Sequence, residues 1–351
     1  MKTLFFLFLI SPLISFSQQN YSYKNLVFEG GGIRGLAYPG AIKVLEEKGI
    51  IKNIERVAGT SAGAITALMI GLDYNSHEMD SVFRSLKIQQ FNDGKSIVGK
   101  IHRLKKEYGI FKGEKFEKWL SDLIYFKTGN ANTTFAELHQ MRQNNPRFKD
   151  VYCTGTNVTK QALQIFSREQ TPMMQLKTAI HISGCIPVYY KPVAIDSLWN
   201  EVPIKNNKNK FDLYVDGGMI NNFPINIFDT CLDGENPFDC ENIQYNPQTL
   251  GLKLERPEQI QKFENGITSI APHPVSSLND YKLALINLLQ ETLARKTIHL
   301  KNEKDRTIHI SYGNVFGKIR KVSDAEKKEL FNNGVVAAEK FFNNLPANPV
   351  R

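Results

Sequence analysis

The sequence predicts a three-layer α/β/α sandwich with a mostly parallel central sheet and a helical insertion. Short β-rich runs alternate with amphipathic stretches along the chain, and two of the runs end in glycine-rich turns that open a helix. Strands are predicted at residues 25–28, 54–58, 150–157, 162–167, 213–215, 250–254 and 307–310. No internal repeat or low-complexity linker divides the chain, so we expect a single domain.

Helical periodicity predicts the elements that cover this sheet. Helices are expected at residues 36–48, 64–72, 171–183 with Pro172 in the first turn, 283–299 and 323–342. Residues 76–147 are more polar and irregular, with a helical stretch at 115–124, and we interpret them as a helical insertion or cap. Asparagine and lysine dominate residues 194–210, which predicts an exposed hairpin or loop.

Residues 1–17 have the pattern of a signal peptide. Lys2 precedes an apolar run at residues 4–10 that is too short to cross a bilayer, and small residues at Ser15 and Ser17 precede a cleavage point at Gln18. A short buried helix is the alternative, but the run lacks the polar face of a surface helix. We therefore expect an exported protein, periplasmic or secreted, that can associate with a membrane surface, with residues 18–351 as its mature domain.

Charge and cysteines give weaker signals. The formal net charge of +9 is spread along the chain, which fits attraction to lipid headgroups or nucleic acid and equally fits a basic soluble surface. Cys231 and Cys240 flank a polar loop and could pair in an oxidising compartment, although spacing alone leaves this bridge open. Cys153 and Cys185 lie in apolar segments, and none of the four has the spacing of a zinc site.

Gly59-Thr60-Ser61-Ala62-Gly63 has the form G-x-S-x-G between a predicted strand and a predicted helix. On such a turn the serine is pushed out of the backbone, Gly59 and Gly63 avoid steric clashes, and the helix N-terminus favours negative charge. This context predicts that Ser61 is a nucleophile. The alternative is a glycine-rich turn in which Ser61 caps the helix.

A second glycine-rich turn also connects a strand to a helix. It consists of Gly30, Gly31, Gly32, Ile33, Arg34 and Gly35. The spacing fits a dinucleotide-binding fingerprint, but that site needs an acidic residue at the end of the next strand, where the serine turn stands instead. We interpret the turn as an oxyanion hole with N–H donors at Gly31 and Gly32 and positive charge from Arg34, or else as a purely structural turn.

The third motif, Asp216-Gly217-Gly218, follows the predicted strand at 213–215. An aspartate at the carboxyl end of a strand lies where open α/β sheets bind their ligands, and the two glycines let the backbone turn away. Taken alone, an Asp-Gly pair is more often a simple turn.

In this order the three motifs resemble the patatin-like phospholipase family, whose pattern is a glycine-rich oxyanion loop, a Gly-x-Ser-x-Gly elbow and a later Asp-Gly-Gly or Asp-Gly-Ala. The similarity continues through residues 108–111, residues 183–187 and the closing helix. It implies a patatin-like core at about residues 25–229, followed by C-terminal strands and helices at 248–343.

The resemblance implies a serine lipid acyl hydrolase of the phospholipase A, lysophospholipase or esterase type. Asp216 would take the proton of Ser61 directly, without a histidine, and neither a metal nor a cofactor would be needed. The implied partner is a lipid or membrane-surface substrate rather than nucleic acid. The acyl pocket is expected within the insertion, with Phe83, Phe91, Ile97, Val98 and Ile101 as lining candidates that could instead be core.

Two alternatives stay open. A Ser-Asp-His hydrolase would need a histidine after the acid, and His273 is the candidate because His299 ends a helix and His309 lies in a strand. His181, on the helix before Gly184, is expected to be a packing or surface residue. The second alternative is a non-catalytic lipid-binding protein, which the complete motif set disfavours.

Overall fold

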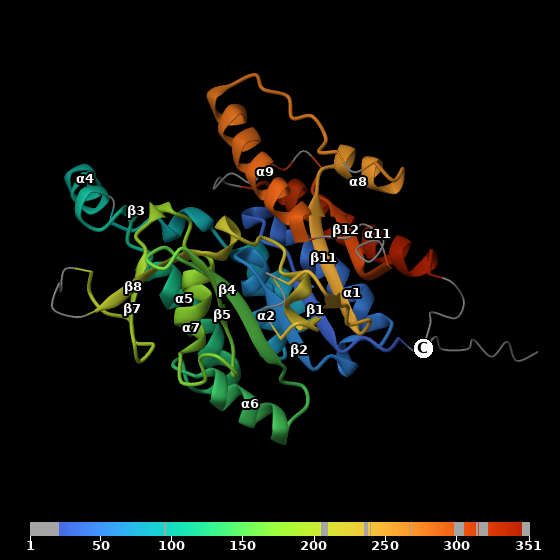
Figure 1. Cartoon of the computed structure of the whole chain (residues 1–351), viewed down its shortest axis with the longest axis horizontal. Coiled ribbons are helices and arrows are strands. Elements are labelled where there is room, and N and C mark those ends of the chain that lie inside the picture. The colour runs from blue at the N-terminus through green and yellow to red at the C-terminus, as the bar shows by residue number, and fades with distance from the viewer. Residues whose placement is uncertain are drawn as a thin grey trace, which may run out of the picture.

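A computed structural model of the chain describes residues 21–94, 96–204, 210–234, 238, 240–267, 269–297, 305–313, 315 and 322–345. The predicted signal peptide, the cleavage point at Gln18 and His299 lie outside these residues. Figure 1 shows a central twisted sheet with helices packed around it.

The main sheet contains eight strands in the order β12-β11-β1-β2-β4-β8-β7, with β5 paired to β4. Their bounds are β1 Asn25–Phe28, β2 Arg56–Gly59, β4 Asp150–Asn157, β5 Ala162–Phe166, β7 Val193–Asp196, β8 Phe211–Asp216, β11 Thr249–Glu255 and β12 Thr307–Ser311. The pairs among β12, β11, β1, β2 and β4 are parallel, whereas β5 and β8 run antiparallel to β4. Two smaller ribbons pair β3 (Gly109–Phe111) with β6 (Val188–Tyr190) and β9 (Thr230–Cys231) with β10 (Ile243–Gln244).

Among the described residues, the helices are α1 Tyr38–Glu47, α2 Ala62–Gly71, α3 Ser76–Ser85, α4 Ile97–Lys106, α5 Glu114–Thr128, α6 Phe135–Asn144, α7 Leu176–Ser183, α8 Pro257–Glu264, α9 Leu278–Thr297 and α11 Asp324–Asn343. Short 3₁₀ turns include η1 Gly32–Ala37, η2 Ile51–Asn53, η3 Ile88–Phe91, η4 Gly217–Met219 and η5 Ile225–Phe228. In the part of the chain that the structure describes, no helix is long and apolar enough to cross a membrane.

Both faces of the sheet are covered, as alternation along β1 illustrates. Leu26 and Phe28 join the main core beneath α1 and α2, while Val27 points to the other face and joins a smaller core with Phe223 and Ile225. The predicted fold class, a mostly parallel sheet flanked by helices, is therefore confirmed.

Strand β4 brings two strand ends together. Along one edge, Cys153 to Asn157 pair with β5. Because a residue in a sheet has one neighbour on each side, β2 and β8 must share the opposite edge: Gly59 lies beside Cys153, and Asp216 lies beside Gly155. Strand β2 runs toward β8 and β8 runs toward β2, so their carboxyl ends meet.

Three predicted helix boundaries are wrong. The helix expected from residue 171 begins only at Leu176, because Gln175 is extended and the carbonyls of Pro172 and Met174 accept the first N–H groups of α6. Helix α9 begins five residues earlier than expected, where Ser277 Oγ accepts from Asp280 N at 3.2 Å. The first helix is preceded by η1, so regular α-helix starts at Tyr38.

The segment 76–147 contains more structure than a peripheral insertion. It forms α3 to α6, and α3 packs against α1 with Met79 and Phe83 buried in the main core. The sequence predicts an exposed hairpin or loop at residues 194–210. Strands β7 and β8 do pair as an antiparallel hairpin, but Ala194 and Ile195 are buried in β7, so the expected exposure is wrong there. Residues 205–209 of this segment lie outside the described residues.

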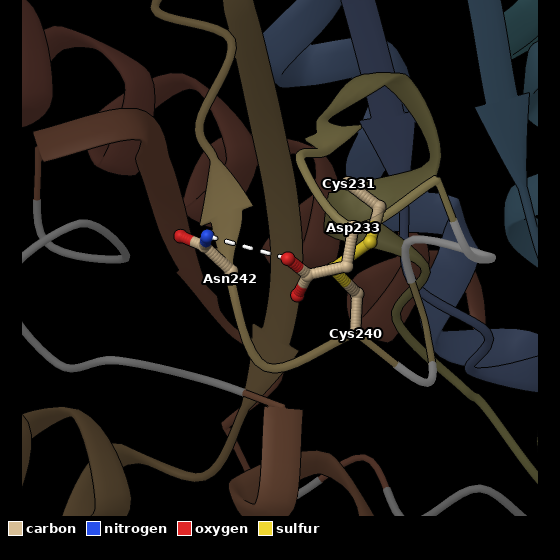
Figure 2. Close-up of a disulfide and its surroundings, with 4 residues drawn as sticks. All are labelled: Cys231, Asp233, Cys240 and Asn242. Carbon is tan, nitrogen blue, oxygen red and sulfur yellow. Dashed lines mark hydrogen bonds between the residues drawn. A yellow bond between two sulfur atoms is a disulfide. The ribbon is translucent and has the colours of Figure 1, made fainter.

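The disulfide left open by the sequence is present. Cys231 and Cys240 are joined at an S–S distance of 2.01 Å with their Cα atoms 5.9 Å apart, beside Asp233 and Asn242 (Figure 2). Cys153 and Cys185 are buried free thiols, as their apolar neighbours predict.

Candidate active site

Ser61 lies on a tight turn between β2 and α2. Its backbone has φ 54° and ψ −120°, a conformation that costs about 1–3 kcal/mol for a residue with a side chain. Gly63 makes the turn possible, since a Cβ there would lie 2.3 Å from the carbonyl oxygen of Phe28. Ser61 N donates to Ser183 Oγ at 3.0 Å, which ties the turn to the end of α7. The strand-turn-helix context predicted for Ser61 is present.

Asp216 is buried at the end of β8, beside the Ser61 turn. Burial raises the pKa of its carboxyl to about 6, while hydrogen bonds from the Ser61 side chain and from Gly218 N lower this pKa in part. The bond from Gly218 N to Asp216 Oδ1 is 2.8 Å long. Ser61 and Asp216, which are 155 positions apart, thus lie within hydrogen-bond reach of each other.

Strand β4 holds both strand ends through two threonines that sequence reasoning missed. Thr154 Oγ1 lies 2.6 Å from Thr60 Oγ1, and Thr156 Oγ1 donates to Asp216 O at 3.0 Å. Thr60 Oγ1 also donates to Asn221 O at 3.1 Å, in the turn that follows Asp216. These bonds link the elbow to the acid motif. A local motif search cannot find them, because the threonines stand in the middle of an ordinary strand.

The glycine loop faces the same space as Ser61. Gly31 has φ −163° and ψ 4°, and Gly32 has φ 55°, which lies in the left-handed region that glycine readily adopts. Within the described residues, no carbonyl or side chain accepts a hydrogen bond from the N–H of Gly31 or Gly32. Arg34 Nε donates to Gly31 O at 3.0 Å, and its guanidinium lies 4.5 Å from the centre of the Tyr312 ring. The loop therefore presents two N–H groups and one braced cation.

Asn222 and Glu29 support this loop from behind. Gly30 N donates to Asn222 O at 2.9 Å, and Asn222 Nδ2 donates to Gly30 O at 3.0 Å and to Glu29 Oε1 at 3.3 Å. Leu254 N donates to Glu29 Oε2 at 2.7 Å. Burial raises the pKa of Glu29 to about 8, despite the opposing charge of Lys253, so this carboxyl is mainly neutral at pH 7. The only sequence signal was their position near the glycine motifs, since Glu29 directly precedes Gly30 and Asn222 follows Gly218 by four positions.

Two cavities that differ in polarity meet at Ser61. The first has a volume of about 110 Å³ and is almost entirely apolar; it is lined by Gly32, Ile33, Gly35, Leu36, Ser61, Ala62, Ile65, Phe83, Leu86, Ile88, Phe91, Phe116, Trp119, Gly184, Ile186 and Tyr190. The second, of about 310 Å³, is more polar and is lined by Gly30, Gly31, Gly32, Arg34, Ser61, Ile186, Pro187, Asp216, Gly218, Met219, Asn222, His273, Ile286, Asn287, Gln290 and Tyr312. We call them the apolar pocket and the polar cleft. Gly32, Ser61 and Ile186 form the boundary between them.

The prediction of the pocket lining is partly wrong. Phe83 and Phe91 line the apolar pocket as expected. Ile97, Val98 and Ile101 do not, because they lie on the outer face of α4 and are exposed. The remaining aromatic wall comes from Phe116 and Trp119 of α5 and from Tyr190 of β6.

The histidines occupy different environments. His273 lines the polar cleft, with Nδ1 3.0 Å from the carbonyl oxygen of Pro274. His309 forms a buried pair with Glu255 on neighbouring strands. His181 is buried against the edge of Phe116, and burial lowers its pKa to about 4. Among the histidines that the structure describes, His273 is the one that lines the cleft with Ser61 and Asp216, so the Ser-Asp-His alternative depends on it.

Among the described residues, one group combines carboxylates and an imidazole with ligand atoms within 4.8 Å of one another: Glu117, His181 and Glu201. Lys177 Nζ lies 3.8 Å from the Glu117 carboxylate, and Lys191 acts electrostatically on both His181 and Glu201. Two lysines thus offset the two carboxylates, and we assign no metal to this group. A second group contains the disulfide cysteines, whose sulfurs are already bonded to each other.

Comparisons with curated proteins point to one family. The family model described as patatin-like phospholipase matches residues 26–229. The chain is 30% identical over 214 residues to "Probable lipid hydrolase 463L" of Invertebrate iridescent virus 6, and 28% identical over 217 residues to the uncharacterized protein YqhO of Bacillus subtilis. These matches cover 61% and 59% of this chain and 66% and 67% of those proteins.

A third relative, lysophospholipase NTE1 of Kluyveromyces lactis, is 26% identical over 212 residues, which are 57% of this chain and 11% of that protein. The chain thus spans about two thirds or less of the curated relatives described here. Among solved structures, VipD from Legionella pneumophila aligns with a TM-score of 0.55 at 18% identity, over 93% of this chain and 67% of that chain. This last likeness concerns the fold alone.

Proposed function

Because the chain belongs to the patatin-like phospholipase family, we propose that it is a serine lipid acyl hydrolase with Ser61 as nucleophile and Asp216 as its base. The observation that carries the proposal is the position of Ser61. It lies where an apolar pocket meets a polar cleft, within hydrogen-bond reach of a buried carboxylate. The relatives named as a lipid hydrolase and a lysophospholipase support the same reaction class.

In the proposed acylation step, Asp216 accepts the proton of Ser61 Oγ as the oxygen attacks the ester carbonyl carbon. The carbonyl oxygen becomes an oxyanion and accepts hydrogen bonds from the N–H groups of Gly31 and Gly32, with the charge of Arg34 close by. The tetrahedral intermediate then collapses. The carbon–oxygen bond to the leaving group breaks, and Asp216 returns its proton to the departing alcohol oxygen.

Deacylation follows the same path with water in place of the serine. Water gives one proton to Asp216 and attacks the acyl carbon, after which Ser61 leaves and recovers the proton. The strained backbone of Ser61 supports this scheme, since it presents the side chain between the two cavities before any substrate binds.

The two cavities suggest how a lipid would be bound. A fatty-acyl chain fits the apolar pocket, whose wall is aromatic and aliphatic. The alcohol part, whether glycerol, a phosphorylated headgroup or a simple alcohol, would then occupy the polar cleft beside Arg34 and Gln290. We propose a phospholipase A, lysophospholipase or esterase activity on this basis.

We also propose that the protein acts outside the cytoplasm. The N-terminal pattern is that of a signal peptide, and a disulfide between Cys231 and Cys240 fits an oxidising compartment.

The test is fatty-acid release by the mature protein from phospholipids, lysophospholipid, triglyceride and a soluble chromogenic ester. Ser61→Ala and Asp216→Asn are each expected to lower turnover at least about a thousandfold, which is the size of effect that removal of a nucleophile or its base has in other hydrolases. Both variants should keep the wild-type melting temperature within a few degrees. His273→Ala serves as the matched control, because His273 lines the same cleft.

A loss in His273→Ala equal to that in Asp216→Asn would move the assignment to a Ser-Asp-His hydrolase. Inactivity of the wild-type protein on every ester, combined with lipid binding, would favour the non-catalytic alternative.

A further inference from the structure

Helix α4 exposes an apolar face that the catalytic scheme does not use. Ile97 and Val98 are 75% and 78% exposed, and Ile101 and Leu104 are 53% and 41% exposed. The spacing of these residues places them along one side of a helix, so they form a continuous strip. Figure 1 shows α4 projecting from the body of the molecule at the left of the view.

The opposite side of α4 is anchored, which fixes the strip toward solvent. Arg103 is buried, and its guanidinium donates to Ile110 O at 3.0 Å and to Gly94 O. Lys100 Nζ lies 5.0 Å from the centre of the Phe111 ring. Four large apolar side chains on one side of a helix form a contiguous exposed apolar patch. Such a patch marks an interaction site, whereas a single exposed apolar residue does not.

The apolar strip continues to the mouth of the site. Tyr108, at the end of the connection from α4, is half exposed, and its neighbour Gly109 pairs with the exposed Val188 of β6. Ile186, just before β6, lines both cavities beside Ser61. Exposed apolar residues therefore occur along the chain path that leads from α4, through the β3–β6 pair, to Ile186 beside Ser61.

On the far side of the polar cleft, α9 extends the same surface. Ile286 lines the cleft and is half exposed, as is Met219, and Leu289 of α9 is exposed as well. Gln290 Nε2 donates to Gly218 O at 3.3 Å, so α9 lies directly beside the acid motif. The entrance to the site is thus bordered by apolar side chains on two sides.

The charge on α4 indicates which partner this surface fits. The helix carries four basic residues and no acidic residue. Lys105 is exposed on the same side as the apolar strip, and Lys106 is exposed at the end of the helix, on the side away from the strip. An apolar face on a basic helix without acidic residues is the pattern of helices that lie in the interface of an anionic bilayer, where the apolar side chains enter the acyl boundary and the ammonium groups contact phosphates.

We propose that these residues form an interfacial docking surface for anionic phospholipid bilayers, with α4 as its main anchor and the mouth of the polar cleft facing the bilayer. The docking surface consists of Ile97, Val98, Ile101, Leu104, Lys105, Lys106, Tyr108, Ile186, Val188, Met219, Ile286 and Leu289. The inference rests on the proposed lipid hydrolase function for its purpose, since docking would deliver a bilayer lipid to Ser61. The binding itself is measurable without catalysis.

The binding experiment uses the full mature chain carrying Ser61→Ala, so that the vesicles stay intact. Cosedimentation is measured with vesicles of phosphatidylcholine containing phosphatidylglycerol, and with vesicles of phosphatidylcholine alone. The test variant replaces Ile97, Val98 and Ile101 with serine. The control variant carries Phe126→Ser and Val336→Ser, at residues that are 72% and 61% exposed on α5 and α11.

We expect the α4 variant to weaken binding to the anionic vesicles at least about tenfold, because it removes three large side chains from the bilayer, while the control variant binds like the parent. Lys105→Gln with Lys106→Gln should reduce the preference for anionic vesicles. Thermal melting checks that the exposed positions leave the fold unchanged. Equal binding by the α4 and control variants, or no binding by the parent, would overturn the proposal.

Activity on two substrates separates this inference from the proposed function. In the active protein, the α4 variant is expected to hydrolyse a soluble short-chain ester at the parent rate and to lose hydrolysis of vesicle lipids about as strongly as it loses binding. An equal loss on the soluble ester would place α4 in the reaction itself and overturn the docking role. Failure of the parent on every ester would refute the hydrolase proposal, whereas the binding comparison would still decide the docking surface.

Discussion

The buried position of Asp216 predicts a specific pH dependence for the reaction. Burial raises the pKa of this carboxyl from its usual 3.8 to about 6, and only the ionised form can accept the proton of Ser61. At pH 5 about one molecule in ten would carry the carboxylate, so kcat/KM should be about tenfold below its plateau. With the usual pKa, more than about nine-tenths of the molecules would remain ionised at pH 5 and the rate would hardly change.

The assay is kcat/KM for a soluble chromogenic ester between pH 4.5 and 9, with circular dichroism at each pH to exclude unfolding. A soluble substrate is needed because vesicle binding has its own pH dependence. The acidic limb should have a midpoint near pH 6 and a slope of one proton, in the wild-type protein and in His273→Ala alike.

A rate that stays flat to pH 4.5 would show that Asp216 is not a base with a raised pKa. If instead the limb near pH 6 disappears in His273→Ala, an imidazole rather than the carboxyl is the titrating group, and the direct Ser-Asp scheme is refuted.

Three further predictions concern groups around the site. In the wild-type protein kcat/KM should fall above about pH 8, because an ionised Glu29 would place negative charge behind the glycine loop. Glu29→Gln should remove this fall, and an alkaline limb that the variant leaves unchanged would point to another group. Replacing Cys231 and Cys240 with serine should lower the free energy of unfolding by about 2–3 kcal/mol in urea, because their bridge closes a loop with a sequence separation of 9; an unshifted midpoint would contradict this. A chelator should leave ester hydrolysis unchanged, and a loss that calcium restores would contradict the metal-free scheme.

The tight turn that carries Ser61 was predictable because its signal is local. Strand, turn and helix N-terminus around Ser61 are encoded in one contiguous stretch, and a Cβ at position 59 would clash with backbone atoms of Gly63 and Ala64 inside it. Gly63 is required by a contact outside the stretch, with the backbone of Phe28. The pocket lining is different. Phe83 and Ile97 both occupy apolar positions in the same segment, yet one is buried at the pocket and the other is exposed.

What separates these two positions is tertiary packing. Arg103 turns the apolar strip of α4 outward by binding the carbonyls of Gly94 and Ile110, contacts that no periodicity in the sequence reveals. The start of α7 is a similar case. Pro172 suggested a helix start, but its carbonyl accepts from Ala136 N of another helix. At both places, hydrogen bonds to residues outside the helix overrode the local preference.

The position of Asp216 was predicted for a reason that the structure corrects. The sequence predicts Asp216 at the carboxyl end of a strand, where open α/β sheets bind their ligands. Strand β8 is antiparallel to β4, so its carboxyl end points toward the amino end of β4, away from the carboxyl ends of the parallel strands. It reaches the site because β8 occupies the part of the β4 edge that lies beyond the end of β2. The carboxyl ends of β2 and β8 then face each other, which brings the side chain of Asp216 next to that of Ser61. This arrangement explains how a carboxylate can reach a serine directly, without an imidazole to bridge a longer gap.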